Sequence, residues 1–351
     1  MENEINEAAT PTEPTEPTAE PTKHGYKCVC AKLGLSMCVY FLCRLFAGWV
    51  SIQLRGVIPV LGETMFEVLS SIMVILFVYV IPLLFTAFIF GSFGRYKGIF
   101  RKLYKVPNRL ARALGTFPAT FGLGQGVALL TALALYIVSR NLSAHSYLDE
   151  LLRPTAVEPS TSIVSLIFLV FMLVVIAPVF EEFWVRGIMF DALKPYGTGM
   201  AIIISSLLFG FMHGSLSMLL YTTAYGLAFG YIRYATNSLF TVTILHAIVN
   251  SIGAGALLLS SLMQITNEEN RVLNTLFIIY ALAFLVLIIV GVVVFFSKIP
   301  TIRKYRIENS WTMIGPWKKT ALFFISIPVI IMMVLVFNEI SQGMLINLIF
   351  S

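Results

Sequence analysis

Charged residues are scarce in this sequence. Asp, Glu, Lys and Arg together make up 12% of its 351 residues, whereas hydrophobic residues make up 58%. A typical soluble domain has roughly 25% charged residues, so this composition excludes an ordinary soluble protein. A chain of this length has room for many membrane-spanning helices, since each needs about 20 mainly apolar residues.

Cysteine is scarce as well. The four cysteines, Cys28, Cys30, Cys38 and Cys43, all lie in or just before the first apolar run. Cys28 and Cys30 are too close together for a CxxC motif, and no second pair completes a zinc site. We therefore interpret all four as free thiols.

We also expect no signal peptide, because residues 1–22 contain six glutamates among Thr and Pro rather than a basic and then an apolar segment. Such a segment has no apolar face to bury and is predicted to be a disordered tail. We place the end of this acidic tail at residue 30. Residues 31–351 are then expected to form one multi-span membrane domain.

Long apolar runs fill the rest of the sequence. They predict an all-α fold, a polytopic membrane helical bundle with about eight or nine transmembrane helices. The sixth run is short and could be tilted or re-entrant. The runs cover residues 33–54, 66–91, 113–139, 161–190, 200–219, 220–236, 238–262, 274–297 and 320–340.

The basic residues predict the orientation of this bundle. The loop 95–112 contains seven Lys and Arg residues and no acid, and the loop 298–319 contains six against one acid. Basic loops favour the cytoplasmic side. Nine spans counted from a cytoplasmic N-terminus place both basic loops inside and the loops 141–160 and 263–273 outside. Since the net charge of +6 lies in short loops, it does not indicate a nucleic-acid partner.

Three polar clusters interrupt these apolar runs. They are Glu181–Arg186, Phe209–His213 and His246–Asn250. Ionisable side chains within a bilayer are costly and usually face the interior of a bundle or a wet cavity. Each cluster is therefore a candidate functional site, and together they resemble the inside of an enzyme.

The first cluster predicts two different roles for its two glutamates. Glu182 and Arg186 are four residues apart on one helical face, which allows an ion pair. Glu181 points about 100° away and is free for another role. Pro178, just before the cluster, predicts a kink and a carbonyl without its usual donor. The alternative is a purely structural ion pair near a helix end.

The second cluster places Phe209 and His213 on one face of a predicted helix. Gly210 and Gly214 form a small-xxx-small pattern that lets another helix approach closely. A histidine in this position can equally serve as a hydrogen-bonded contact between helices.

The third cluster places His246 and Asn250 one turn apart, so an imidazole and an amide can aim at one point. Two converging donors in a water-poor site can hold a developing oxyanion. Packing through interhelical hydrogen bonds is the alternative interpretation. The two membrane histidines both follow the acid cluster, and this joint pattern favours a shared site.

The three motifs, EExxxR, FxxxH and HxxxN, resemble the signature of the CAAX-protease and bacteriocin-processing family (the CPBP or Abi family), whose best-known branch is the Ras-converting CAAX prenyl protease. The resemblance covers about residues 161–262, and Ala177-Pro178 before the glutamates agrees with it. It implies an intramembrane endopeptidase whose site opens toward the cytoplasm. The absence of a GxSxG motif fits such an enzyme.

The resemblance also implies the residue roles. Glu181 would be the general base that takes a proton from water, and His213 would help to hold that water. His246 and Asn250 would stabilise the tetrahedral oxyanion. The supporting residues that set the geometry would be Glu182, Arg186 and Phe209.

A zinc ion is the mechanistic alternative. Glu181, His213 and His246 offer a carboxylate and two imidazoles, which can form a zinc first shell. The chain has no HExxH motif, and Asn250 suits an oxyanion hole better than a fourth ligand. We therefore predict no cofactor and no metal.

Two other functions stay open at this point. One is a non-catalytic membrane scaffold or bacteriocin-immunity protein of the same family, which the intact motifs disfavour. The other is a transporter with a proton relay, which predicts paired repeats that the sequence lacks. The expected partners are membrane lipids and a peptide or small membrane-protein substrate. The expected location is a bacterial plasma membrane.

Overall fold

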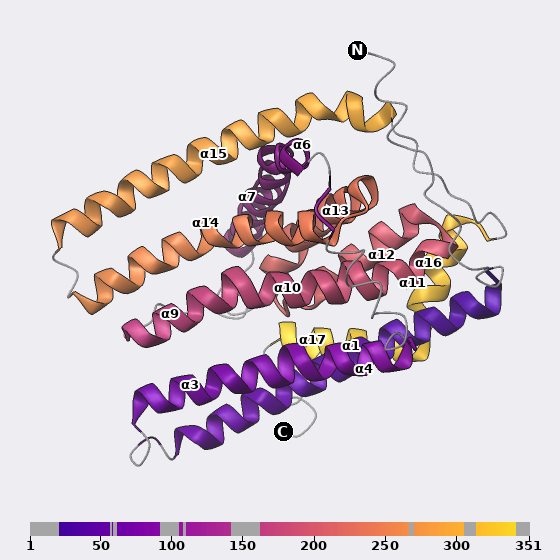
Figure 1. Cartoon of the computed structure of the whole chain (residues 1–351), viewed down its shortest axis with the longest axis horizontal. Coiled ribbons are helices and arrows are strands. Elements are labelled where there is room, and N and C mark those ends of the chain that lie inside the picture. Colours follow the sequence, from indigo (N-terminus) through magenta and orange to yellow (C-terminus); the bar gives the residue numbers. More distant parts are fainter. Residues whose placement is uncertain are drawn as a thin grey trace.

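The computed structural model describes residues 21–56, 58, 62–91, 105–107, 110–141, 162–266, 270–304 and 314–341. Within these ranges the ordered elements are helices and none is a strand, which confirms the predicted all-α class. The helices α1 and α3 below, α9 and α10 in the middle, and α14 and α15 above run along the long axis (Figure 1).

The first half of the chain forms α1 (Lys23–Arg55), α3 (Glu63–Val74), the π-helical segment η2 (Ile75–Val80), α4 (Ile81–Ile89), α6 (Leu110–Leu114) and α7 (Phe117–Asn141). A long composite helix follows, made of α9 (Ile163–Phe171), the π-helical segment η3 (Met172–Ile176), α10 (Ala177–Glu182), the π-helical segment η4 (Phe183–Met189), α11 (Phe190–Leu193) and η5 (Lys194–Tyr196). The remaining helices are α12 (Thr198–Phe211), α13 (Leu216–Thr236), α14 (Leu239–Ile265), α15 (Arg271–Lys304), α16 (Pro316–Phe324) and α17 (Ile327–Ile340).

Six helices are long and apolar enough to cross a membrane, and a bent pair makes a possible seventh. The bent pair is α16 and α17, which meet at 68° in the last predicted run. The fifth run forms only the 14-residue helix α12, whereas the sixth, predicted to be short, forms the 21-residue helix α13. The described residues thus confirm a polytopic bundle but not the count of eight or nine spans.

Helix α1 begins within the stretch assigned to the acidic tail. The Thr22 hydroxyl caps it by accepting a hydrogen bond from the Gly25 amide at 3.0 Å. Tyr26 and Cys30 are fully buried, so residues 23–30 belong to the membrane domain. Three predicted features fall outside the described residues: the tail over 1–20, most of the basic loop 95–112, and all but the first residue of the loop 141–160.

Proline does not break the fourth predicted span. The span runs as one continuous helix over Ile163–Tyr196, with Pro178 directly after the π-helical segment η3. Pro82 follows η2 in the same way. A π-helical turn shifts hydrogen bonds from i−4 to i−5, so the missing amide of the proline changes the pairing of one turn without ending the helix. The proline that was predicted to kink this helix therefore lies next to a π-helical segment.

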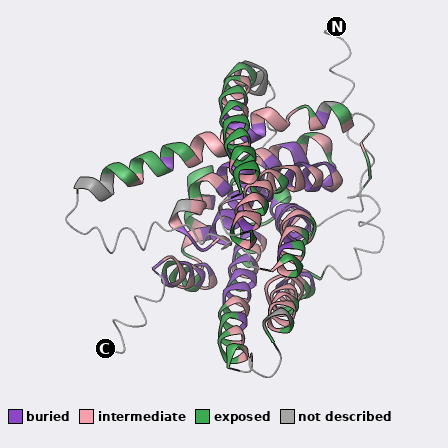
Figure 2. Cartoon of the chain, turned by 90° about the vertical axis from the view of Figure 1, so that its left-hand side faces the viewer, coloured by how far each residue is buried: buried purple, intermediate pink, exposed green. Residues whose placement is uncertain are grey.

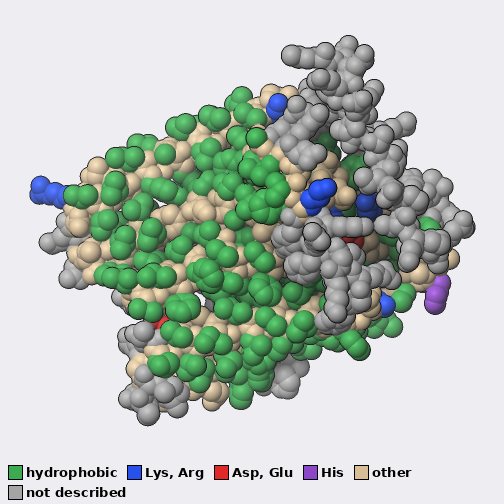
Figure 3. All heavy atoms as spheres, viewed as in Figure 1, with side chains coloured by type: hydrophobic (Ala, Val, Ile, Leu, Met, Phe, Trp, Pro, Cys, Tyr) green, Lys and Arg blue, Asp and Glu red, His purple; other side chains and the backbone are tan. Residues whose placement is uncertain are grey.

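The surface of the bundle is apolar along its length. Figure 2 shows buried residues gathered inside the bundle and exposed ones along the outer faces of the peripheral helices. Figure 3 shows that hydrophobic side chains dominate the visible face, with Lys and Arg toward the two ends. Helix α15 packs on α7, where a side chain at Gly122 would overlap the backbone of Gly291. This surface suits a bilayer, as expected for an integral membrane protein.

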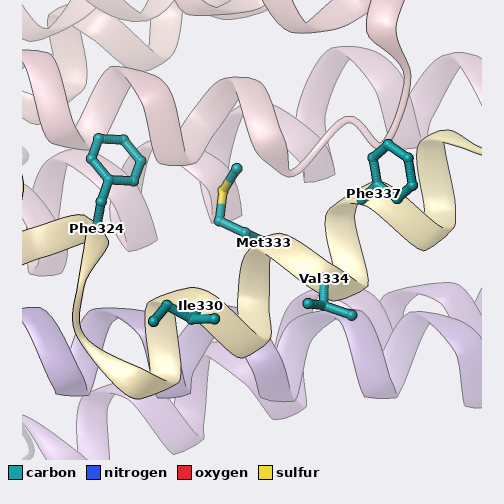
Figure 4. A pocket seen from close by; sticks show the side chains of 5 residues that line it. All are labelled: Phe324, Ile330, Met333, Val334 and Phe337. Atoms are coloured by element: carbon teal, nitrogen blue, oxygen red, sulfur yellow. The ribbon is translucent and has the colours of Figure 1, made fainter.

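An apolar hollow of about 580 Å³ lies where α16 turns into α17. Its walls carry no residue of the three polar clusters, and the side chains that line it (Figure 4) are Phe324, Ile330, Met333, Val334 and Phe337. Since none of these is polar, the hollow offers space but no chemistry.

Candidate active site

The structure brings the three predicted clusters together in the interior of the bundle. The first cluster lies on α10 and η4, the second at the end of α12, and the third on α14. Helix α10 contacts α14, and η4 contacts α4, α12 and α14. The site is therefore built from segments that are far apart in the sequence.

Glu182 is the centre of a fully buried ionic network. Its Oε1 atom accepts hydrogen bonds from Arg186 Nη1 at 3.2 Å and from His246 Nδ1 at 2.8 Å. The side chains of Glu182 and Arg186 are both 0% exposed. The predicted ion pair is confirmed, and it also fixes the ring of His246. Because the carboxylate can only accept, Nδ1 of His246 carries the hydrogen.

Phe209 connects the network to both histidines. Its ring lies under the Arg186 guanidinium at 4.3 Å, a cation–π contact. The same ring meets His213 at 5.0 Å and His246 at 5.7 Å, both edge to face. Phe229 of α13 stacks on His246 at 5.3 Å. These rings hold the polar groups in a dry environment.

Glu181 points away from Arg186, as its helical position predicts. Its Oε2 lies 3.9 Å from Nε2 of His246, and its side chain is 12% exposed. This distance is too long for a direct hydrogen bond. The Arg186 guanidinium is hydrogen-bonded to Glu182 and not to Glu181. Glu181 is thus the carboxylate of the site that is not bonded to Arg186.

His213 lies in a turn and not, as predicted, on a helical face. Helix α12 ends at Phe211, and Gly214 adopts a positive φ of 61°, which favours glycine. The His213 ring still reaches back, and its Nδ1 donates to the Phe209 carbonyl at 2.8 Å. In a neutral ring this leaves Nε2 as a hydrogen-bond acceptor.

The small-xxx-small prediction is correct for one of its two glycines. A side chain at Gly210 would overlap Thr223 of α13, so α12 and α13 approach closely there. Gly214 is instead the turn residue that ends the segment. The spacing indicated a helix interface at both positions, but the turn begins between them.

Asn250 donates a hydrogen bond to a backbone carbonyl that Pro178 leaves without its usual donor. In η3 the Ala177 amide bonds the Met172 carbonyl, five residues back. Pro178 has no amide hydrogen for the next carbonyl, that of Leu173. Asn250 Nδ2 donates to this carbonyl at 2.8 Å, which joins α14 to the composite helix. The second Nδ2 hydrogen of Asn250 stays available for another acceptor.

Helix α14 begins about two turns before His246 in a sequence that sets its start sharply. Asn237 is left-handed, with φ of 47°, and ends α13. Ser238 then caps α14 by accepting a hydrogen bond from the Thr241 amide at 3.2 Å. The Asn237-Ser238 pair therefore fixes the register that presents His246 to Glu182.

Sequence reasoning missed several polar side chains around the site. Tyr79 of η2 lies close to the acid cluster, where its ring packs against Phe180 at 5.8 Å. Arg44 of α1 and Glu339 of α17 form an ion pair at 2.5 Å, near the His213 turn. Charges inside apolar runs are a signal that could have identified Arg44 and Glu339. Nothing in the sequence distinguishes Tyr79 from other tyrosines.

The zinc alternative requires at least three ligand side chains close together. Within the described residues, no three His, Cys, Asp or Glu side chains form a group that could hold a metal ion. The Nδ1 atoms of both histidines are hydrogen-bonded, to the Phe209 carbonyl and to Glu182, so Nε2 is the nitrogen that each ring leaves unbonded by these contacts. We therefore derive no step through a metal.

The fold and the site define a helical integral membrane protein with carboxylates and histidines buried among its helices. Residues 163–252 match the family model described as Type II CAAX prenyl endopeptidase Rce1-like. This match supports assignment to the CAAX protease (CPBP) family and confirms the resemblance predicted from the three motifs. The matched segment carries all three polar clusters. No curated protein and no solved structure matches the chain.

Proposed function

We propose that this protein is an intramembrane endopeptidase in which Glu181 activates a water molecule. The family match supports peptide hydrolysis in general. The observation that carries the proposal further is the contrast between the two glutamates. Glu182 is neutralised by Arg186 and bonded to His246, whereas Glu181 is slightly exposed and 3.9 Å from His246 Nε2.

In the proposed mechanism, Glu181 takes a proton from the water, and the hydroxide attacks the scissile carbonyl. The carbonyl oxygen becomes an oxyanion as the new carbon–oxygen bond forms. Nε2 of His213 is the acceptor that helps to hold the water, since Nδ1 already donates to Phe209. Glu181 then passes the proton to the leaving amine as the peptide bond breaks.

The oxyanion would be stabilised by His246 and Asn250. Donation from His246 Nε2 requires a proton on that atom, and the Glu182 carboxylate at Nδ1 offsets the positive charge of the ring. Asn250 offers its second amide hydrogen, because the first bonds the Leu173 carbonyl. Each such donor typically contributes about 10²–10³-fold in rate.

The proposed substrate is a peptide or a small membrane protein, cut at a bond that reaches the membrane interior. The site lies among apolar helices, so a substrate must enter from the bilayer or its boundary. We further propose that the N-terminus and the opening of the site face the cytoplasm of a bacterial plasma membrane. The distribution of Lys and Arg supports this orientation.

The decisive experiment compares the termini of membrane-associated peptides in cells carrying the native chain or Glu181→Gln. The change is nearly isosteric, so we expect normal membrane expression and loss of the Glu181-dependent termini. Glu67→Gln is the matched control, because Glu67 lies in α3 and bonds Ser165 instead of the site. Identical termini in all strains would favour the scaffold or immunity function.

A purified assay tests the substrate and the metal-free mechanism together. A quenched CAAX peptide is offered with and without a farnesyl group, before and after treatment with a strong chelator. We expect cleavage that survives the chelator. Loss of cleavage on chelation and recovery with zinc would overturn the metal-free mechanism, and the two peptides reveal whether the lipid is required.

A further inference from the structure

Three side chains outside the family-matched segment contact the turn that carries His213. They are Tyr40 and Arg44 of α1 and Glu339 of α17, here called the clamp. We propose that the clamp residues are positioning residues that hold His213 in its working orientation. This inference rests on the proposed function, in which His213 holds the water.

The clamp binds the backbone atom directly before His213. The Tyr40 hydroxyl and Arg44 Nη1 both donate to the Met212 carbonyl, each at 2.9 Å. Met212 is the C-cap of α12, so its carbonyl has no partner within that helix. A cation at a helix C-terminus is also favoured by the helix dipole. The two donors thus fix the peptide group that precedes His213.

The other side of the turn rests against Glu339. A side chain at Gly214 would lie 3.0 Å from Cγ of Glu339, and the positive φ of Gly214 also favours glycine there. Glu339 also accepts from Nε of Arg44 at 2.5 Å, with side-chain exposures of 27% for Arg44 and 17% for Glu339. His213 is therefore enclosed between a residue bonded by Arg44 and a residue packed on Glu339.

The clamp also touches the acid cluster. The Tyr40 ring packs against Trp184 of η4 at 5.3 Å, next to the glutamates. Tyr40 is thereby in contact with the segments of both the first and the second cluster. It sets the distance between the helix that carries Glu181 and the turn that carries His213.

Packing of α1 on α17 does not itself need the ion pair. A side chain at Gly34 would lie 2.5 Å from the Val329 amide nitrogen, and Cys38 Sγ donates to the Pro328 carbonyl at 3.3 Å. These contacts lie more than one turn from Arg44. A charged pair is costly inside an apolar span, and the helix contact is made without it, so its placement at His213 points to a role in the site.

The test follows the His213 ring directly in the full chain, reconstituted in lipid nanodiscs and labelled with ¹⁵N-histidine. The chain has four histidines, so His24→Gln and His145→Gln leave only His213 and His246. We expect the native His213 signal to report a protonated Nδ1. In Arg44→Met, this signal should move or split while that of His246, held by Glu182, stays in place.

Kinetics on the quenched farnesylated CAAX peptide give the second measurement. We expect Arg44→Met to lower kcat on the order of 10²-fold with little change in KM, as displacement of a catalytic group by about 1 Å does. Tyr40→Phe, which leaves Arg44 on the Met212 carbonyl, should lose less. Arg44→Lys should recover part of the loss, because it keeps the charge but not the two-pronged geometry.

Arg55→Met is the matched control, because Arg55 is an exposed arginine at the end of the same helix. A His213 signal that is unchanged in Arg44→Met, or equally changed in Arg55→Met, would overturn the clamp. Simultaneous loss of both histidine signals in Arg44→Met would show that the clamp serves folding alone, and would also overturn the proposal. If the peptide is not cleaved by the native chain, the proposed function fails, while the histidine signals still test the clamp.

Discussion

At the scale of single residues, the Glu182 carboxylate has a marked asymmetry. One of its oxygens accepts from both Arg186 and His246, while the other is buried without a hydrogen-bond partner among the described residues. An ion pair in such a position is not a strong source of stability, because both charges have lost their water. Its value lies in fixing the His246 ring.

This asymmetry predicts a specific order of stabilities. Arg186→Met leaves Glu182 charged and uncompensated, so we expect a loss of about 3–5 kcal/mol in folding free energy. The double variant Glu182→Leu/Arg186→Met removes both charges and should regain most of that stability. Thermal unfolding of the detergent-purified variants measures the order.

Activity should not follow stability in these variants. The double variant no longer bonds Nδ1 of His246, so cleavage should stay low even where the fold is recovered. A double variant as unstable as Arg186→Met would show that the pair contributes to folding in a way that charge burial does not explain.

At the scale of elements, two of the three π-helical segments among the described residues are followed by a proline. Segments η2 and η3 each precede a proline, and η2 lies against α10. The widened turn before Pro178 exposes the Leu173 carbonyl, which Asn250 then bonds. The carbonyl left without a donor in the composite helix thus forms a hydrogen bond that joins this helix to α14.

This attachment predicts coupling between Pro178 and Asn250. Asn250→Leu leaves the Leu173 carbonyl buried without a donor, so we expect a loss of about 1–3 kcal/mol in folding free energy. In a Pro178→Ala background the loss should be smaller, because the substituted alanine restores an amide hydrogen at that position. A double-mutant cycle on thermal stability measures the coupling.

Pro82→Ala combined with Asn250→Leu is the matched control for this cycle. Pro82 follows η2, so the same substitution there changes a π-helical segment without affecting the Leu173 carbonyl. Its effect should add to that of Asn250→Leu. Coupling of equal size in both cycles would contradict the proposed role of Asn250 as the donor that replaces the missing amide of Pro178.

The elements also show what the sequence could and could not predict. The predicted apolar runs lie mainly in helices, although the runs 200–219 and 320–340 are each interrupted by a turn, and the Glu182–Arg186 pair follows from helical spacing alone. The turn at His213 was missed because an apolar run continues through Gly214. The clamp on Met212 could not be predicted, because it joins α1 and α17 to α12 through packing that a local pattern does not contain.

At the scale of the whole molecule, all four cysteines are free thiols, as predicted. They provide a test of the orientation of the N-terminus in the membrane. Cys28 is exposed near the start of α1, Cys30 and Cys38 are buried, and Cys43 is partly buried within the span. A membrane-impermeant thiol reagent should therefore react mainly with Cys28. If the N-terminus is cytoplasmic, intact cells should stay unlabelled and inverted vesicles should be labelled.

Cys28→Ser identifies the labelled site, since it should abolish the signal in inverted vesicles. Labelling of Cys28 in intact cells would place the N-terminus outside and reverse the proposed orientation. The basic loops, which predicted that orientation, would then lie on the wrong side of the membrane.

The contact between α1 and α17 joins two helices that are synthesised at different times. Cys38 and its partner Pro328 lie 290 positions apart, so α1 is made long before α17. At typical rates of synthesis this gap lasts roughly 15–60 s. During that interval Glu339 does not yet exist, and the His213 turn has no support on that side. A nascent chain therefore carries every residue of the proposed site before the clamp is complete, and we expect activity only after α17 has joined the bundle.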